Sequence, residues 1–403
     1  MAVGKIVLWL GSLWGTLTLT GCASTANITV VNPSDVDRVD EMVEVPLSRL
    51  GRVADKIRPG VGLKDGQGQI VPTQITHDSL LIFPVSLKAH GKATFRVEPG
   101  LTAKVQPVAC GRQYPERLDD MAWENDKSAY RAYGPALQRT GERSYGYDIM
   151  VKRVGYPVLE KRYAMELDAK ARKQIADWRK AGERAKADSL NRIISYHVDH
   201  GDGMDCYNVG PTLGGGTAAL WVDSAIVFPY CYKEYEILDN GPLRFTVKLT
   251  YGPATVGGNA DVVETRVITL DAGSYLNRTD VSYRNLADPT PMVAGIVLHP
   301  QNPDGYRYDR AQGYVAYADS TNNAKAGNGV IYIGVVFPDA LTDAGVAQGH
   351  VLGFGQYRPG TAFRYYWGSG WSKGGVAGMD EWCDYLTKYP MRWKEPLQIK
   401  IKR

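Results

Sequence analysis

The stretch PLRFTVKLTY, Pro242–Tyr251, decides the fold of this 403-residue chain. Apolar side chains occupy every second position, at Leu243, Phe245, Val247, Leu249 and Tyr251. A period of two is typical of a β-strand with one buried face. Similar stretches follow it: DVVETRVITL (261–270), SYLNRTDVSYR (274–284), MVAGIVLH (292–299), GVIYIGVVFP (329–338) and PLQIKIK (396–402). So many strands with short polar turns predict a large antiparallel β-sandwich, and periodicity alone leaves a barrel open.

The rest of the chain divides around this region. Residues 27–105 contain short strand patterns separated by Pro and Gly, which predict a small N-terminal β-sandwich. Residues 106–403 form the predicted large domain, and strong helix formers at 159–190 predict one helical insertion in it. The fold class is therefore all-β.

The N-terminus reads as an export signal over residues 1–22. Lys5 precedes a mostly apolar run that ends in Leu19-Thr20-Gly21-Cys22, a match to the lipobox of bacterial lipoproteins. We expect Cys22 to carry a lipid that anchors the exported protein to a membrane, in the periplasm or at the outer membrane.

Charge and cysteine content narrow the function classes. The formal net charge is +4, and residues 160–192 hold ten Lys and Arg against six Asp and Glu, so this segment accounts for the excess. A balanced remainder argues against nucleic acid as a partner. Cys110, Cys206, Cys231 and Cys383 could form a disulfide in an oxidising compartment or remain buried thiols.

The stretch Ser195–Trp221 has the highest density of groups that transfer protons. It contains His197, His200, Asp205 and Tyr207, and we expect it to open as a strand from Ile194. A histidine titrates near neutrality, and a neighbouring carboxylate can set its tautomer. His299 ends another predicted strand. The candidate catalytic residues are His197, His200, Tyr207 and His299.

A metal centre is not favoured at these histidines. On a strand, the His197-x-x-His200 spacing points the two rings to opposite faces. The glycine-rich run GPTLGGGTA (210–218) lacks the pattern of a phosphate loop or a dinucleotide fold. We therefore expect no metal and no cofactor.

Cations and aromatic rings supply candidate binding residues. Arg131 and Lys152, on two predicted strands, could pair with an anion, or be ordinary surface cations. The glycines of FRYYWGSGWSKGG (363–375) predict a flexible loop, and its rings and cations resemble a sugar platform with an anion clamp beside it, although aromatic loops also pack on sheets without binding anything. The candidate substrate-binding residues are Arg131, Lys152, Asp205, Trp367, Trp371 and Lys373.

Five blocks of the sequence resemble one family. They are NDKSAYRAYGPAL (125–137), YGYDIMVKR (145–153), YHVDHGDGMDCYNVGPTLGGG (196–216), NGPLRFTVKLTY (240–251) and YYWGSGWSK (365–373). In combination they are similar to a secreted bacterial family known as domain of unknown function 4861. The resemblance implies a galactose-mutarotase-like supersandwich, an occurrence in polysaccharide-utilisation loci, and similarity to a dehydratase that removes water from the terminal uronate of ulvan oligosaccharides.

The resemblance implies chemistry that the residues can be matched against. Taking the C5 proton of a uronate needs a base, an acid for the departing C4 hydroxyl and a cation on the carboxylate. We expect His200 or His197 as base, Tyr207 or His299 as acid, and Arg131, Lys152 or Lys373 on the carboxylate. The alternatives are a sugar epimerase that uses His197 and Asp199, and a glycan-binding lipoprotein without catalysis.

Overall fold

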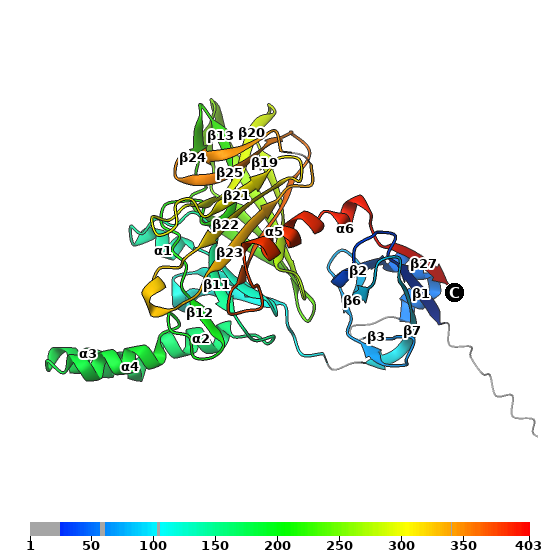
Figure 1. The fold of residues 1–403 in the computed structure, drawn as a ribbon, viewed down its shortest axis with the longest axis horizontal. Helices are drawn as coiled ribbons and strands as arrows, with labels where there is room; N and C mark the ends of the chain where they lie inside the picture. The colour runs from blue at the N-terminus through cyan, green and yellow to red at the C-terminus, as the bar shows by residue number, and fades with distance from the viewer. Residues whose placement is uncertain (1–24, 57–60, 103–104, 340) are drawn as a thin grey trace, which may run out of the picture.

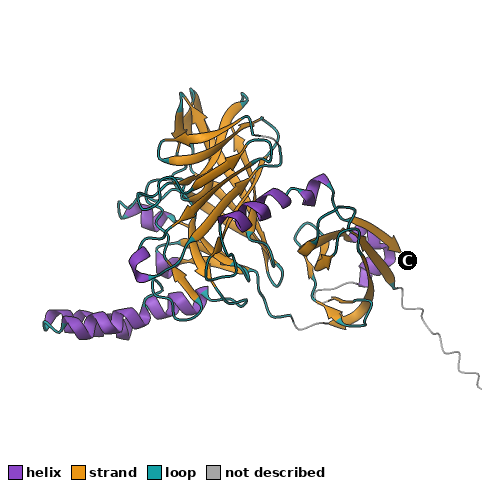
Figure 2. Ribbon diagram, in the orientation of Figure 1, coloured by secondary structure: helices purple, strands orange, loops and turns teal. Residues whose placement is uncertain are grey.

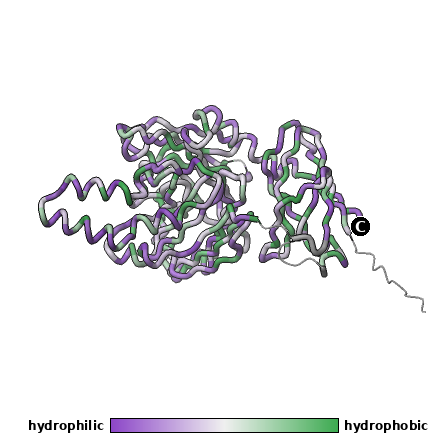
Figure 3. The backbone as a smooth tube through the Cα atoms, turned by 90° about the horizontal axis from the view of Figure 1, so that it is seen from below, coloured by the Kyte–Doolittle hydropathy of each residue, from purple (hydrophilic) through white to green (hydrophobic). Residues whose placement is uncertain are grey.

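The computed structural model describes residues 25–403 except 57–60, 103–104 and 340. The predicted signal at 1–22, with Cys22, lies outside the described residues. A small strand-rich unit lies beside a larger one, and a pair of helices projects from the larger unit (Figures 1 and 2). Seen from below, the helical pair and the small unit lie at opposite ends of the molecule (Figure 3).

The small unit consists of two antiparallel sheets that enclose a core of their own. The strand orders are β27-β1-β7-β3-β4 and β2-β6-β5. The elements are β1 (Ala26–Val31), β2 (Arg38–Pro46), η1 (Leu47–Lys56), β3 (Val61–Lys64), β4 (Ile70–Val71), β5 (Gln74–Ile75), β6 (Leu80–Leu87), β7 (Lys92–Thr102) and β27 (Gln398–Lys402). Alternate residues of β1, Ile28 and Val30, point into this core as their period of two requires.

The C-terminal strand β27 belongs to the small unit and not to the large domain in which its sequence was placed. It pairs with β1 along its whole length, with Ile28 opposite Ile401. Ile399 and Ile401 pack against the core of the small unit, while the residues between them face solvent. The strand pattern was read correctly, but a period of two does not say which sheet a strand joins.

The large unit is a sandwich of two antiparallel sheets, so the sandwich is observed and not the barrel. The sheet orders are β15-β16-β18-β19-β26-β23-β22-β21, with β17 paired to β18, and β14-β13-β20-β25-β24. The first sheet contains β15 (Tyr232–Asn240), β16 (Arg244–Tyr251), β17 (Ala254–Val256), β18 (Asn259–Asp271), β19 (Leu276–Arg284), β21 (Tyr306–Asp309), β22 (Tyr314–Asp319), β23 (Ile331–Val336) and β26 (Phe363–Trp371). The second contains β13 (Gly215–Val222), β14 (Ala225–Val227), β20 (Thr290–Val297), β24 (Asp343–Ala347) and β25 (His350–Tyr357). Apolar residues of both sheets form one buried cluster between them.

A third sheet, in the order β12-β11-β10-β9-β8, packs on the sandwich. Its strands are β8 (Cys110–Tyr114), β9 (Asp120–Glu124), β10 (Ser128–Ala132), β11 (Asp148–Lys152) and β12 (Gly203–Asp205). The Tyr147 ring stacks on the Trp367 ring of β26, with centroids 4.0 Å apart and planes inclined by 6°. The Trp123 Nε1 donates a hydrogen bond of 2.8 Å to Asn277 Oδ1 on β19. These contacts fix the third sheet to the sandwich.

Helices occupy the connections. They are η2 (Pro115–Arg117), α1 (Pro135–Arg139), α2 (Leu159–Glu166), α3 (Ala169–Lys180), α4 (Arg184–Ile194), η3 (Ala324–Ala326), α5 (Met379–Lys388) and α6 (Met391–Lys394). The insertion expected at 159–190 consists of α2, α3 and α4. No helix in the described part of the chain is long and apolar enough to cross a bilayer.

The expectation that a strand begins at Ile194 was wrong. Ile194 is the last residue of α4, and its side chain packs with Ile175 of α3. The following residues to Asp202 form turns and bends. The alternation that suggested a strand arises because Ile194 faces the helical pair and Tyr196 packs beneath the third sheet, in a different cluster.

Replacing Trp367 by Ala should lower the free energy of unfolding by about 3–5 kcal/mol, because the change leaves a large cavity between β26 and the third sheet. The side chain is fully buried, and its Nε1 donates to Thr279 Oγ1 at 2.8 Å. Urea titration of the near-ultraviolet circular dichroism measures the change. Tyr156→Ala, at a 56% exposed ring, is the control and should alter stability by less than about 0.5 kcal/mol. An equal response of the two variants would contradict the proposed role of the stack.

Candidate active site

The candidate site is built around Arg131 on β10, which three carboxylates surround. The Arg131 guanidinium contacts Asp148 on β11, lies 3.1 Å from Asp205 on β12 and lies 3.5 Å from Asp120 on β9. All four side chains are buried. Strand pairing explains this arrangement, because Arg131 lies opposite Asp148 and Asp205 lies opposite Met150 in the same sheet. The expected pairing of Arg131 with a substrate anion is therefore not supported, since protein carboxylates already surround the guanidinium.

The cluster holds more negative than positive charge. Burial and, after it, the Asp148 carboxylate raise the pKa of Asp205 to about 6. Burial also raises the pKa of Asp120 to about 6, with Asp148 and Asp205 adding to the effect. Tyr133 donates a hydrogen bond of 3.0 Å to Asp148, and its pKa is raised mainly by burial. The cluster can therefore take up and release a proton near pH 6.

His197 lies at the exposed edge of this cluster. Its Nδ1 donates to the Asp205 carbonyl oxygen at 3.0 Å and lies 3.8 Å from the Asp205 carboxylate. The His197 side chain is 52% exposed. It is therefore accessible to solvent while it remains beside Asp205.

A second group of polar residues adjoins the first through the chain segment Asp205–Tyr207. The His299 Nδ1 contacts the Asp319 carboxylate, and the rings of His299 and Tyr207 have centroids 5.5 Å apart. The Tyr207 hydroxyl is buried, and no hydrogen-bond partner for it exists among the described residues. Burial first, and then the Asp319 and Asp148 carboxylates, raise the pKa of Tyr207 well above its ordinary value. The phenol is thus protonated at neutral pH and can donate.

The structure brings together five of the residues predicted from sequence. They are Arg131, His197, Asp205, Tyr207 and His299. Asp319 holds His299 by one ring nitrogen, which leaves Nε2 as a proton acceptor when the ring is neutral. This constellation can perform general acid–base chemistry.

Two other predicted residues are placed elsewhere. The His200 Nε2 donates to the Ser195 carbonyl oxygen at 3.0 Å, in the turn after α4. Lys152 is buried and donates to Glu124 at 2.6 Å, so it is not available to a substrate carboxylate. Lys152 is thus not an ordinary surface cation, because Leu159 and Tyr163 of α2 pack with Met150 of β11 and Gly374 lies close to the Lys152 carbonyl oxygen.

The tryptophans expected on a flexible binding loop are part of a buried strand. Trp367 belongs to the core between the sheets. Trp371 is 2% exposed, and its Nε1 donates to the Asn328 carbonyl oxygen at 2.8 Å. The cations of Arg153 and Lys373 lie 5.2 and 5.9 Å from the Trp371 ring. Neither tryptophan offers the open face that a sugar platform needs, while Lys373 is exposed.

The Trp371 end of β26 and the turn that bears the histidines nevertheless meet at one side chain. Arg153, beside the Trp371 ring, pairs with Asp199. The segment from Asp319 to Asn328 connects the partner of His299 to the partner of Trp371. These regions are therefore neighbours, joined by Arg153 and not by a shared aromatic surface.

With this geometry in place, the chain can be compared with known proteins. The family model described as "Domain of unknown function (DUF4861)" matches residues 30–399.

The chain belongs to this family.

The resemblance predicted from five sequence blocks is thus confirmed. "Uncharacterized protein P7" of Formosa agariphila is 26% identical over 315 residues, which cover 73% of this chain and 71% of that protein.

Two solved structures from Enterococcus faecalis give more distant matches. One is an alpha-mannosidase, with 10% identity and a TM-score of 0.44, and the other is a protein in glycosyl hydrolase family 38, with 11% identity and a TM-score of 0.43. Each alignment covers 94% of this chain, which spans 46% and 47% of those two chains, slightly less than half of their lengths. Scores this low carry no inference about activity.

Sequence reasoning missed Asp148, Asp120, Tyr133 and Asp319 as members of the site. Arg131 and Tyr133 are two residues apart near the end of one strand, so their shared face was a usable signal. Asp319 gave no such signal, because its contact with His299 depends on how β22 pairs within the sheet.

The four described cysteines, Cys110, Cys206, Cys231 and Cys383, are all free, and no cluster of metal-binding side chains exists in the described part of the chain.

The raised pKa of Asp205 predicts a pH-dependent response to its replacement by Asn. A carboxyl with a higher pKa in the folded than in the unfolded chain stabilises the fold at low pH, and this contribution is lost as the pH rises through about 6. Asn carries no charge, so the D205N variant does not lose this contribution. Its free energy of unfolding, relative to that of the wild type, should therefore rise by about 1–3 kcal/mol between pH 4 and pH 7. Urea unfolding at several pH values measures this difference. Asp223→Asn, in an exposed turn, is the control, and a D205N difference that is constant with pH would contradict the prediction.

Proposed function

We propose that this DUF4861 protein is a carbohydrate-active enzyme, a carbon–oxygen lyase that removes water from a non-reducing-end uronate of an oligosaccharide. The observation that carries this proposal is the pairing of His299 with Asp319 beside the buried Tyr207 hydroxyl. An elimination of this kind needs an oriented base and a protonated acid close together. The family resemblance to a uronate dehydratase supports the same substrate class.

In the proposed reaction His299 is the base and Tyr207 is the acid. Asp319 accepts a hydrogen bond from the Nδ1–H of His299, which leaves the Nε2 lone pair free to take the C5 proton of the uronate. The C5 electrons form the C4=C5 double bond, and the C4 hydroxyl departs as water with the proton of the Tyr207 hydroxyl. The high pKa of Tyr207 keeps this proton in place until the leaving group needs it.

The uronate carboxylate needs a cation. The surroundings of the three candidates, Arg131, Lys152 and Lys373, favour one of them. Arg131 and Lys152 are held by buried carboxylates. Lys373, an exposed cation beside Trp371, is assigned to the substrate carboxylate in this proposal. Neutralising that carboxylate lowers the pKa of the C5 proton and stabilises the developing negative charge.

The two alternatives receive less support from the contacts. The epimerase alternative uses Asp199, which is already paired with Arg153 and accepts hydrogen bonds from the backbone amides of Gly201 and Gly203. The glycan-binding alternative uses an exposed aromatic surface, whereas Trp367 and Trp371 are buried.

Incubation of the protein with saturated uronic oligosaccharides tests the function. We expect new absorbance from the conjugated enol ether without shortening of the saccharide. H299Q and Y207F should each lower kcat by roughly 10²–10⁴-fold, because each removes one proton-transfer group. His90→Gln, at an exposed histidine of the small unit, is the matched control and should retain activity. Absence of new absorbance, or full activity in both site variants, would overturn the assignment.

The export of the protein is a separate proposal, supported by the Leu19–Cys22 sequence. We expect Cys22→Ser to prevent lipid attachment and to move the protein from the membrane fraction to the soluble fraction. Fractionation of cells that express each form measures this. If both forms remain in the membrane fraction, Cys22 is not the anchor.

A further inference from the structure

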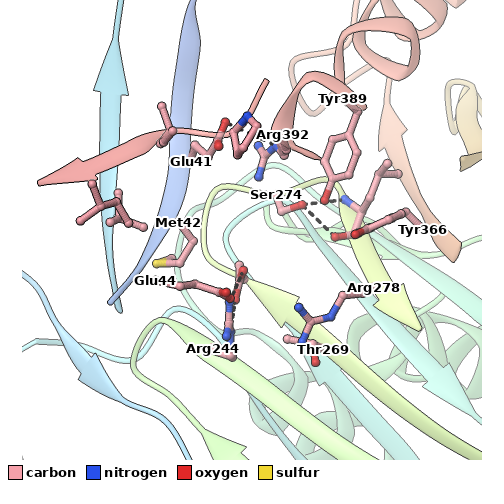
Figure 4. Close-up of a pocket in the computed structure, with 16 residues that line it drawn as sticks. Glu41, Met42, Glu44, Arg244, Thr269, Ser274, Arg278, Tyr366, Tyr389 and Arg392 are labelled. Carbon is pink, nitrogen blue, oxygen red and sulfur yellow. Dashed lines mark hydrogen bonds and ion pairs between the residues drawn. The ribbon is translucent and has the colours of Figure 1, made fainter. Parts of the chain in front are cut away.

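A cavity of about 250 Å³ lies where the small unit, the nine-stranded sheet and the C-terminal segment meet (Figure 4). β2 lines it from the small unit, and β16, β18 and β19 line it from the sandwich. The chain from Tyr389 to Ile399 closes it as it passes from one unit to the other. None of the residues assigned above to the reaction lines this cavity.

The carboxylates at this cavity already have cationic partners. Arg244 donates to both oxygens of Asp271, at 2.6 and 2.8 Å, and to Glu44 at 2.6 Å. Glu41 accepts a hydrogen bond of 3.1 Å from Arg38, which also donates to two carbonyl oxygens of the C-terminal segment. Each of the three carboxylates thus accepts hydrogen bonds from Arg244 or Arg38, and none accepts one from the other two arginines of the lining.

Those two arginines, Arg278 and Arg392, have no close carboxylate of their own. Within the described residues, the carboxylate nearest to Arg278 is Asp280, at 3.9 Å, and both Asp280 oxygens accept closer hydrogen bonds from Arg364, at 2.6 and 2.9 Å. Arg392 likewise lies 3.9 Å from Glu41, which Arg38 holds more closely. Both guanidinium groups thus keep donors for another anion.

A tyrosine ring lies against Arg392, and the side chains of Tyr366 and Tyr389 belong to the lining. The Arg392 guanidinium lies 4.6 Å from the centre of the Tyr389 ring. The Tyr366 ring stacks on the Trp393 ring, with centroids 4.8 Å apart. Burial raises the pKa of Tyr366 to about 12 and also raises that of Tyr389, so both hydroxyls are protonated at neutral pH, and the Tyr389 hydroxyl bonds to Ser274. The labelled side chains converge on the same space in Figure 4.

We propose that this cavity binds a small oxyanion, a carboxylate or a sulfate group, between Arg278 and Arg392. A planar guanidinium donates two parallel hydrogen bonds to such a group, and two guanidiniums from different elements can hold it from two sides. The ligand would offset the one positive charge by which Arg38, Arg244, Arg278 and Arg392 exceed Glu41, Glu44 and Asp271. Because the lining comes from both units, bound anion would also link the small unit to the sandwich.

The test is calorimetric titration of the full chain with sodium sulfate and, separately, with sodium D-glucuronate. D-glucose and sodium chloride at matched ionic strength are the neutral and salt controls. We expect saturable binding of one or both oxyanions and none of the controls. Binding of sulfate alone identifies a free inorganic anion as the ligand, whereas binding of glucuronate identifies a saccharide carboxylate.

Arg278→Gln should lower the affinity about tenfold or more, because it removes one charge-assisted contact while leaving the partly exposed site folded. Arg307→Gln, an exposed arginine that pairs with Asp380 outside the cavity, is the matched control and should bind as the wild type does. R392Q should weaken binding as R278Q does, and urea unfolding of each variant verifies its fold.

The same variants separate this proposal from the proposed reaction. R278Q should retain turnover of the uronate substrate, and H299Q should retain oxyanion binding. The proposal is overturned if the wild type shows no saturable binding of either oxyanion, if R278Q and R307Q bind equally, or if H299Q abolishes binding while R278Q does not.

Discussion

The stack of Tyr147 on Trp367 is the contact on which the arrangement of the site depends. It joins the third sheet to the core of the sandwich, and Tyr130 meets the same Trp367 ring at 5.1 Å between centroids. Successive side chains of a strand point to opposite faces. Residues next to these tyrosines, Arg131 and Asp148, therefore lie on the other face, where they form the charged cluster. The tyrosines of this pair of strands thus anchor the third sheet to the sandwich, and the residues next to them in sequence form the charged cluster on the opposite face.

The charged cluster is held in an environment that disfavours its own charge. Burying a carboxylate is unfavourable unless it is paired, and one guanidinium here faces three carboxylates. Removing one partner from such a group leaves an uncompensated buried charge, so the members are interdependent. The same conditions raise the pKa of Asp120 and Asp205 into the range where protons exchange near neutrality. Burial is the main cause of these raised values, and the neighbouring carboxylates of the cluster add to it.

The sequence predicted the elements better than it predicted which faces they bury. Alternation over Pro242–Tyr251 identified a strand, and β16 begins at Arg244 within that stretch. The residues 363–375 were misread as a loop because of their glycines. A Cβ at Gly368 would lie 2.0 Å from the Tyr275 carbonyl oxygen, so this glycine is needed for close packing inside a sheet. The sequence shows that a glycine is present, but it does not show that a neighbouring backbone approaches closely enough to require one.

The contacts that complete the site join residues whose meeting depends on tertiary structure. His197, Asp205, Tyr207 and His299 were identifiable because their residue types carry proton chemistry. Asp319 meets His299 only because β22 lies in the sheet where it does, and no local pattern encodes this contact.

At the junction of the two units, the position of the C-terminal strand likewise determines which residues meet. β27 completes a sheet of the small unit, so the chain must leave the sandwich after α5 and cross the gap between the units (Figure 1). Arg38 holds this crossing through the carbonyl oxygens of Met391 and Glu395, each at 2.8 Å. The crossing places Arg392 opposite the sheet that bears Arg278. Two cations far apart in sequence thus face one cavity because the small unit is built from both ends of the chain.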